Sequence, residues 1–199
     1  MFRYDKKVDI WSKKMIAGLN KVWGNEIPKK QTSKKSLTLP FLIDYLNKYL
    51  NKYGKTIIKR FNELTGLSYK INDFGYYINN TPVSLHNSEK LFISISQNHP
   101  FTKYPTVIIH EISHIYFYKY INSTKFLKTC NVISKKEKNE LKEIITVIIN
   151  KEFTDIIDKP DEGYSNHKNI RKQILKLWEK ENPNFDKWVK EVIKIYKKN

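Results

Sequence analysis

The 199-residue sequence predicts an α+β fold, in which helical segments precede and follow a small, mostly antiparallel sheet. Apolar residues recur at helical spacing in the first third of the chain and again after Pro105, whereas short β-rich runs occupy residues 67–97. No internal repeat is visible, and the length favours one domain. We therefore expect a helical N-terminal segment (residues 1–66) and a main domain (residues 67–199) that together form one compact unit.

Three helices are expected ahead of the sheet. In residues 8–23 apolar side chains lie mostly three or four positions apart, and Gly24 ends this helix at a polar, lysine-rich connector. A second helix begins near Pro40, since proline suits a first helical turn, and is interrupted at Gly54. The third helix follows and ends at Gly66, which is typical of a C-terminal cap.

The β-rich region contains short runs of β-branched and aromatic residues. These runs are 69–71, 76–78, 83–85 and 91–95. Between them lie sequences rich in asparagine, glycine and proline, which favour turns. We expect three or four strands, and an exposed edge at residues 91–95 would let an extended peptide add to the sheet.

The second helical region begins with a strongly apolar helix over residues 106–120. A further helix is expected over residues 135–153. After a turn that starts at Pro160, the same apolar spacing predicts a helix over residues 166–181 and a last helix from about Pro183.

The composition restricts the class of protein. The formal net charge is +17, but lysines are scattered through every segment, which favours a solvated surface over a dedicated nucleic-acid face. Nucleic acid stays open as a partner, although no motif supports it. Cys130 is the lone cysteine, so the chain forms neither an internal disulfide nor a thiolate-rich zinc site.

The distribution of apolar residues argues against a membrane protein. No run approaches the roughly 18 apolar residues that a membrane-spanning helix requires, and no apolar stretch follows the basic residues near the N-terminus. A cytoplasmic protein without membrane contact is therefore expected. Nothing in the sequence indicates an oligomeric state.

The strongest chemical signal is the segment His110-Glu111-Ile112-Ser113-His114. On a helix, residues i and i+4 share a face, so the two histidines can present their imidazoles to one cation. Glu111 lies about 100 degrees around the helix from His110, where it can act as general base toward metal-activated water without being a ligand. Zinc is the metal that this set of residues favours.

The surroundings of the motif strengthen this interpretation. Residues 107–109 and 115–117 are uncharged, which indicates a helix buried on nearly all sides. Two histidines and a glutamate buried there need partners. A hydrogen-bonded polar cluster on a core helix is the alternative to a metal site.

Residues 107–116 resemble the active-site helix of the zincin metallopeptidases, which has the same five-residue core between uncharged flanks. The resemblance implies a zincin-like fold and a Zn²⁺ cofactor held by His110 and His114. It also implies that Glu111 is general base and acid, and that the substrate is a peptide or protein. The metzincin branch is excluded, because Phe117 and Tyr120 stand where its extended motif requires glycine and histidine.

The gluzincin branch, which takes its third ligand from a glutamate on a second helix, remains. Glu143 is the preferred candidate, because strongly apolar residues follow it, and a carboxylate where a helix becomes buried needs a partner. Glu140 is a weaker candidate in a charged stretch, and a surface role for both stays open. Val147 occupies the position where thermolysin-like gluzincins carry an aspartate, so a distant or miniature relative is expected.

Several interpretations stay open for the turn that precedes the helix over residues 166–181. Zincins commonly stabilise the oxyanion of the tetrahedral intermediate with a later histidine or tyrosine, and Tyr164 or His167 could serve. His167 could instead be an exposed residue near a helix start, or could replace the glutamate as third ligand. His86 and His99 are expected at the surface, in turns around the sheet.

The sequence therefore predicts a zinc-dependent peptidase of gluzincin type, in which Glu111 acts as general base. The alternative is a non-catalytic or regulatory zincin-like binding module, with nucleic acid as a possible partner because of the charge. A toxin or phage-type lysis enzyme is a third interpretation.

Overall fold

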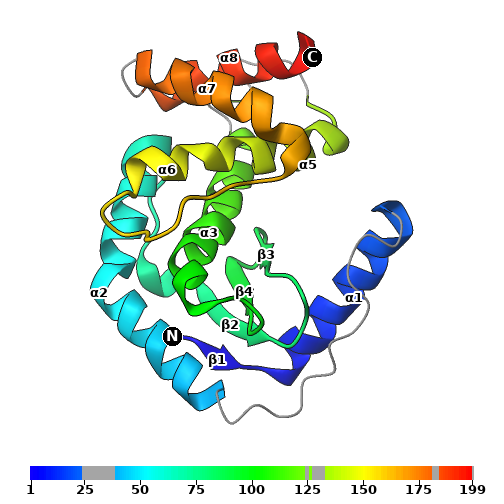
Figure 1. Cartoon of the computed structure of the whole chain (residues 1–199), viewed down its shortest axis with the longest axis vertical. Coiled ribbons are helices and arrows are strands. Elements are labelled where there is room, and N and C mark those ends of the chain that lie inside the picture. The colour runs from blue at the N-terminus through cyan, green and yellow to red at the C-terminus, as the bar shows by residue number, and fades with distance from the viewer. Residues whose placement is uncertain (24–38, 124–125, 127–132, 181–183, 199) are drawn as a thin grey trace.

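The computed structural model describes residues 1–23, 39–123, 126, 133–180 and 184–198, and describes only the backbone of residues 18–23. The helices are α1 (Lys6–Trp23), α2 (Leu39–Thr65), α3 (Tyr104–Ile121), α5 (Lys135–Ile145), α6 (Ile149–Glu152), α7 (Lys168–Lys180) and α8 (Phe185–Lys198). Short 3₁₀ helices are η1 (Ile71–Asp73), η2 (Phe101–Lys103), η3 (Thr146–Ile148) and η4 (Ser165–His167). The strands are β1 (Arg3–Tyr4), β2 (Gly75–Asn79), β3 (Leu85–Asn87) and β4 (Phe92–Ser96). The predicted α+β class is confirmed (Figure 1).

The two helices predicted between Pro40 and Gly66 form the single helix α2. Gly54 does not interrupt it. Instead, a Cβ atom at Gly54 would lie 2.9 Å from Ile71 Cδ1, so the glycine allows η1 to pack closely against the helix. Gly66 ends α2 as predicted: its φ is +70°, and its N–H donates to the carbonyl oxygen of Asn62 at 2.8 Å.

The sheet has the strand order β1-β2-β4-β3, and the prediction that it is mostly antiparallel is wrong. β1 and β4 both pair with β2 in parallel, and only β3 pairs antiparallel, with β4. The chain passes from β2 through β3 before β4 inserts between them. β4 is therefore a central strand and has no free edge, which also contradicts the predicted peptide-binding edge at residues 91–95.

Side chains alternate between the two faces of β4, and both faces are covered. Ile93 and Ile95 point toward the main core. On the other face, the Trp11 ring of α1 lies 5.0 Å from the Phe92 ring, and Ser12 Oγ is 3.3 Å from Ser94 Oγ. Cover on both faces is what parallel strands require, and it explains why every residue of β4 is buried.

Other predicted strands are displaced. Residues 69–71 form no strand but lead into η1, where the Asp73 carboxylate accepts a hydrogen bond from the backbone N–H of Lys70 at 2.7 Å. The run at residues 83–85 is shifted to β3, and the two-residue strand β1 was not predicted.

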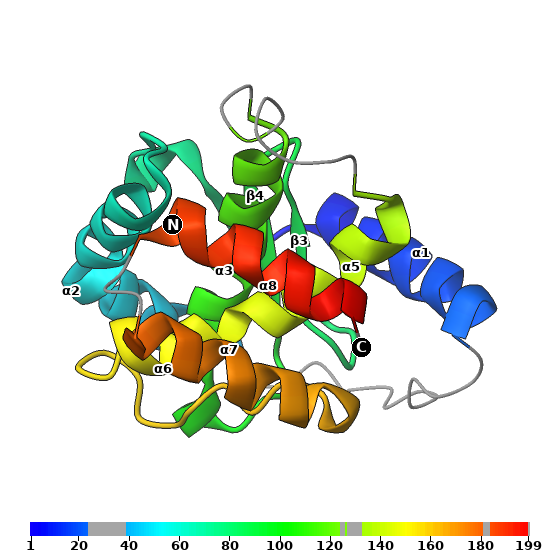
Figure 2. The same cartoon turned by 90° about the horizontal axis from the view of Figure 1, so that it is seen from above.

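The predicted C-terminal helices are confirmed in outline by α3, α5, α6, α7 and α8, with the turn η3 inside the predicted helix over residues 135–153. Figures 1 and 2 show α7 and α8 packed over α5 and α6 at one end of the molecule. The predictions for Gly24, Cys130 and Pro183 lie outside the described residues. Among the described helices, none has the length and apolar character needed to cross a membrane.

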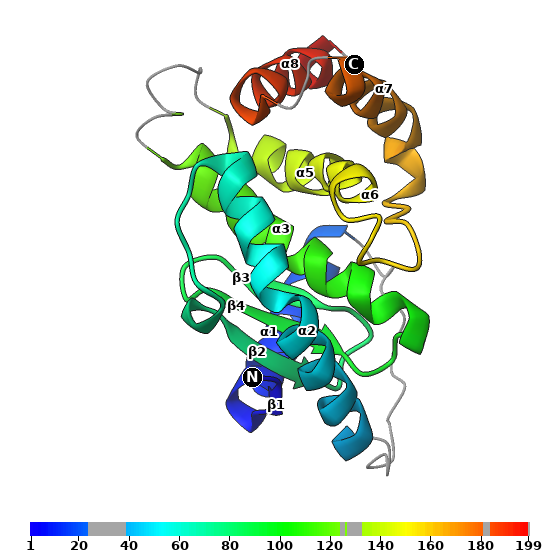
Figure 3. The same ribbon diagram turned by 90° about the vertical axis from the view of Figure 1, so that its left-hand side faces the viewer.

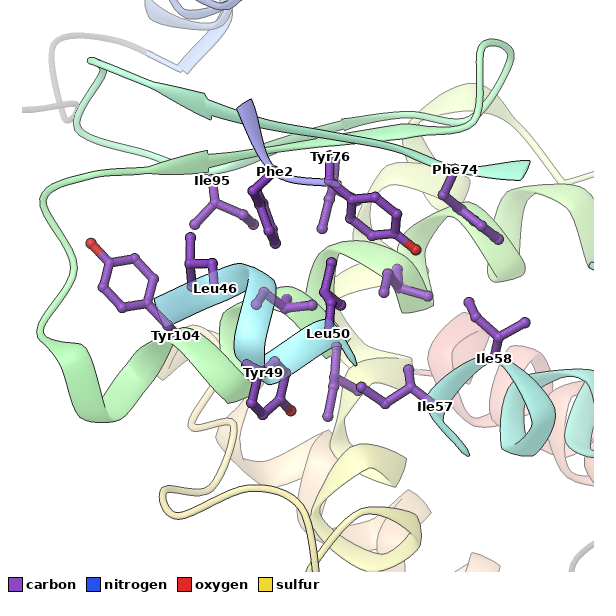
Figure 4. Close-up of a cluster of buried hydrophobic side chains, with 14 of the residues drawn as sticks. Phe2, Leu46, Tyr49, Leu50, Ile57, Ile58, Phe74, Tyr76, Ile95 and Tyr104 are labelled. Atoms are coloured by element: carbon purple, nitrogen blue, oxygen red, sulfur yellow. The ribbon is translucent and has the colours of Figure 1, made fainter. Parts of the chain in front are cut away.

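Helix α3 lies between the sheet and the C-terminal helices, and is buried along nearly its whole length (Figure 3). Its first part packs in a core cluster with α2 and the sheet, drawn in Figure 4, where Phe2 lies beside Tyr76. Its end packs in a second cluster with α5, α7 and α8. Residues from both sides of position 66 therefore share one core, and α3 is packed from both clusters where the motif lies.

Candidate metal centre

Helix α3 brings the two motif histidines together. Pro105 lies in its first turn, and the uncharged residues on both sides of the motif are buried. The rings of His110 and His114, one turn apart, have centroids 4.4 Å apart. The His114 side chain is only 2% exposed and that of His110 is 19% exposed, so both imidazoles are largely buried.

Glu143 reaches the same point from the last turns of α5. That helix starts at a capping box formed by Ser134 and Glu137, and Glu143 is buried beside its apolar face. One carboxylate oxygen of Glu143 lies 3.4 Å from His110 Nε2, and the other lies 3.4 Å from His114 Nε2. The structure therefore brings together the three ligands expected from the sequence.

These donors fit zinc. Bonds of about 2.0–2.1 Å in a tetrahedral site place neighbouring ligand atoms about 3.3 Å apart, which is close to the spacing found here. Ligand atoms of His110, His114 and Glu143 all lie within 4.8 Å of one another. Two imidazoles and one carboxylate are also a donor set of catalytic zinc sites, which keep a further position open.

The ionisable groups of the site shift one another's pKa values. Burial lowers the pKa of His110, but hydrogen bonds to Asp161 and Glu143 outweigh this effect and raise the pKa to about 10. Burial and the positive charge of Lys142 lower the pKa of His114 to about 3. The pKa of Glu143 lies well below its usual range, because the charge of Lys142 and the hydrogen bonds with His110 and His114 outweigh burial.

Asp161 orients His110. The Nδ1 atom of His110 lies 3.1 Å from Asp161 Oδ1, so Nδ1 donates to this carboxylate and Nε2 faces Glu143. Asp161 also accepts a hydrogen bond from the Thr146 hydroxyl at 2.5 Å and one from Nη2 of the buried Arg171 at 2.8 Å. The sequence analysis did not identify this partner, because Asp161 lies 51 positions after His110, in the turn predicted to start at Pro160.

Arg171 joins the two acidic segments of the site. It is 4% exposed, and its Nη1 atom donates to the carbonyl oxygen of Glu143 at 2.7 Å. Its Nη2 atom donates to the carbonyl oxygen of Asp161 at 2.7 Å. Gly163 gives the guanidinium room: its φ is +64°, and a Cβ atom there would lie 2.6 Å from Arg171 Cζ.

Glu111 lies beside the three converging residues, with a side chain that is 8% exposed. Its Oε2 atom is 3.0 Å from Nδ1 of His86, which comes from β3. His86 is 13% exposed, so the prediction that it is a surface residue in a turn is wrong. Burial, followed by the charge of Lys142, holds the pKa of His86 well below its usual value.

His99 is also not the surface residue expected from the sequence. It is partly buried, and its Nε2 atom lies 2.9 Å from the hydroxyl of Ser84. Both predictions fail for the same reason. Polar residues near turns are expected to be exposed, but the fold packs the His86 ring against His114 and the His99 ring against Tyr104, both in α3.

Lys142 is a further residue that the sequence did not indicate. Its ammonium lies 2.6 Å from Glu143 Oε1, and its side chain is 17% exposed. The charge of Glu143 outweighs burial and raises the pKa of Lys142, so the ammonium is kept. Reading the helix by periodicity places Lys142 on a solvated face, but its long side chain bends back to the carboxylate.

Tyr164 and His167 lie near this centre without contacting its three converging residues in the described part of the chain. The Tyr164 side chain is 50% exposed, and its ring lies 5.9 Å from that of His167. Burial raises the pKa of Tyr164, and the negative charge of Glu143 adds to this effect. Burial lowers the pKa of His167. Glu140 points elsewhere and accepts a hydrogen bond from Tyr196 at 2.6 Å.

A pocket of about 680 Å³ lies against α5. It is lined by residues of α5, η4, α7 and α8 that include His167, Glu140 and Tyr196. His110, His114 and Glu143 do not border it. His167 therefore borders this pocket as well as lying near the candidate metal centre.

No protein-family model, curated protein or solved structure matches the chain. The chemistry of the site is therefore argued from its own residues. These supply two imidazoles and a carboxylate for one cation, a buried carboxylate beside them, and an ammonium group. Such a set can bind a divalent metal, move a proton and stabilise negative charge.

Proposed function

We propose that this chain is a zinc-dependent peptidase with a zincin-like, gluzincin-type centre. The observation that carries the proposal is the convergence of His110, His114 and Glu143 on one point, with Glu111 beside them. Zinc bound there would supply Lewis acidity and would lower the pKa of water toward 7. The remaining steps are properties of the protein's own side chains.

Glu111 moves the proton. Its Oε2 atom is engaged by His86, which leaves Oε1 to accept a proton from the attacking water and to deliver it to the leaving amine. The helix α3 fixes this carboxylate one residue after His110. The buried surroundings exclude bulk water and so strengthen each electrostatic interaction.

Three residues are candidates for stabilising the oxyanion. Lys142 carries a positive charge in contact with Glu143, whereas Tyr164 and His167 stand farther out on the turn around η4. Hydrogen-bond donors aimed at developing negative charge give large rate effects. We assign the main stabilisation of the oxyanion to the charge of Lys142. Tyr164 and His167 are further candidates, which would contact a substrate farther from Glu143.

The sheet edge suits an extended peptide. Among the described residues, β3 pairs with β4 alone, so the opposite side of β3 offers backbone groups for strand addition. β3 also contacts α3, so a peptide bound to this edge would lie next to the proposed metal centre. This geometry supports a peptide or protein as substrate.

The proposal is tested by metal analysis and by cleavage of a proteome-derived peptide library, read by mass spectrometry. The purified full chain should hold about one zinc ion. Glu111→Gln should keep the zinc and reduce cleavage by about 10²–10⁴-fold. Glu63→Gln, which changes an exposed carboxylate on α2, is the matched control and should change neither quantity. A folded chain that binds no zinc would overturn the proposal.

The net charge of +17 favours one competing function, a zincin-like module that binds nucleic acid without catalysis. This function predicts steeply salt-dependent binding of DNA or RNA. It also predicts that Glu111→Gln leaves that binding unchanged while no peptide is cleaved by the parent chain. Measuring peptide cleavage and nucleic-acid binding for the parent chain and for Glu111→Gln therefore distinguishes the two functions.

A further inference from the structure

Several contacts fix the position of His86, although this residue lies outside the helix that carries the motif. It is the middle residue of β3, where it pairs with Ile93 of the central strand β4. The register of the sheet therefore fixes its backbone, and its side chain lies against α3. The His86 ring is 4.6 Å from that of His114 and 5.9 Å from that of Tyr118, so neighbouring side chains also restrict its rotation.

The contact that matters is the one with Glu111. An ionised carboxylate only accepts hydrogen bonds, so the Nδ1 atom of His86, 3.0 Å from Glu111 Oε2, must carry the proton. A buried carboxylate without a donor would be destabilised. His86 supplies that donor and also limits the rotamers that Glu111 can adopt.

The same residues allow a different interpretation. Ligand atoms of His86, Glu111 and His114 also lie within 4.8 Å of one another, so His86 could be a metal ligand. A cation at that position would occupy the carboxylate that is needed as base. His110 differs from His86 in this respect, because its Nδ1 atom is bound to Asp161 while Nε2 faces Glu143. The contact of His86 Nδ1 with Glu111 favours positioning over ligation.

We propose that His86 is a positioning residue that holds the Glu111 carboxylate, through one hydrogen bond from Nδ1, in the orientation required for proton transfer. The inference rests on the proposed peptidase function, because it assigns Glu111 the role of base. Because His86 belongs to β3, a peptide that adds to this edge strand would bind to the same strand that orients Glu111.

The first test needs no substrate. In the ¹⁵N-labelled, zinc-loaded full chain, nuclear magnetic resonance should find His86 protonated at Nδ1, with a hydrogen-bonded proton whose signal moves when Glu111→Ala removes the acceptor. A proton on Nε2, or a nitrogen shift typical of metal binding at His86, would overturn the proposal. This readout stays decisive even if no peptide is cleaved.

Zinc affinity separates positioning from ligation. In competition with a chelator, His86→Leu should bind zinc within about threefold of the parent chain, whereas His110→Gln should lose far more because it removes a ligand. A loss of affinity in His86→Leu as large as that in His110→Gln would make His86 a ligand and overturn the proposal. Loss of zinc from the parent chain would instead overturn the peptidase function.

Kinetics with a peptide cleaved by the parent chain give the final test. His86→Leu should lower kcat by about 10–100-fold, the range expected when a supporting partner is lost, and should leave KM nearly unchanged. His86→Asn keeps a donor at the position of Nδ1 and should recover most of the rate. In a Glu111→Gln background His86→Leu should lower kcat no further, since the two residues act as one unit.

His99→Leu is the matched control, because His99 is also a partly buried histidine held by one hydrogen bond. It should leave kcat and zinc affinity unchanged, and thermal melting should show that all the variants are folded. Equal losses of kcat in His86→Leu and His86→Asn, or additive losses with Glu111→Gln, would contradict the proposed role.

Discussion

Asp161 accepts a hydrogen bond from Nδ1 of His110 at 3.1 Å, although 51 positions separate the two residues along the chain. A carboxylate behind a metal-binding histidine fixes the tautomer of the ring and makes it a better ligand. Val147, four positions after Glu143, is buried in the second core cluster and supplies no such carboxylate. A residue from a later turn fills the position behind His110.

Asp161→Asn should weaken zinc binding by about 10–100-fold, because the amide holds the charge and orientation of His110 less well. Competition with a fluorescent chelator measures the change. Asp158→Asn, in the same connecting segment but exposed, is the control and should bind zinc like the parent chain. Unchanged affinity in Asp161→Asn would show that His110 needs no such partner.

Arg171→Met should destabilise the fold, because it leaves the Asp161 carboxylate and the Glu143 carbonyl oxygen without their buried donor. Removing one partner of a buried ion pair costs about 3–5 kcal/mol. Urea unfolding of the zinc-free protein, followed by circular dichroism, measures this free energy of unfolding.

Arg60→Met is the control for this comparison. Arg60 also makes a two-point contact with an aspartate, Asp155, but at the surface, where an ion pair contributes about 0–1 kcal/mol. A loss of stability in Arg171→Met no larger than that in Arg60→Met would show that the buried contacts of Arg171 do not stabilise the site.

Gly163→Ala should weaken both the fold and zinc binding. Its φ of +64° disfavours any side chain, and the added Cβ would meet the Arg171 guanidinium at 2.6 Å, which must then move away from Asp161. Gly66→Ala is the matched control. Its φ is +70°, but no atom lies within 4 Å of an added Cβ, so only the backbone strain of about 1–2 kcal/mol applies.

The measurement is zinc affinity together with urea unfolding of both alanine variants. Gly66→Ala should bind zinc normally, whereas Gly163→Ala should bind it less tightly and lose more stability. Equal effects in the two variants would mean that the position of Arg171 has no influence on the metal centre.

The part of the site that could be predicted from the sequence is the part set by local geometry. His110 and His114 are one helical turn apart, so their proximity follows from the helix alone. Glu143 could be inferred because a carboxylate among apolar residues needs a partner. His86 and Asp161 lie 25 and 51 positions from the residues they contact, and only the tertiary fold brings them there.

The fold could likewise be predicted only where local sequence patterns determine it. Apolar periodicity predicts most helices but wrongly predicts a break at Gly54, because a close approach between α2 and Ile71 is not visible in a local pattern. Short turns between β-rich runs favour hairpins, which led to the antiparallel prediction. The insertion of β4 between β2 and β3 depends on the cover that α1 and the core give to its two faces.

The protonation of His110 makes the stability of the zinc-free protein depend on pH. In the zinc-free protein the pKa of His110 is raised to about 10, above the value of about 6.5 for an unfolded histidine, so the folded state binds its proton more tightly. The resulting stabilisation is fully present below pH 6.5 and is lost as the pH rises toward 10. Urea unfolding in the presence of a chelator should therefore show stability that decreases over this interval. His110→Gln removes the titrating group and should give a flatter dependence there, and equal slopes in the two proteins would contradict the proton shared with Asp161 and Glu143.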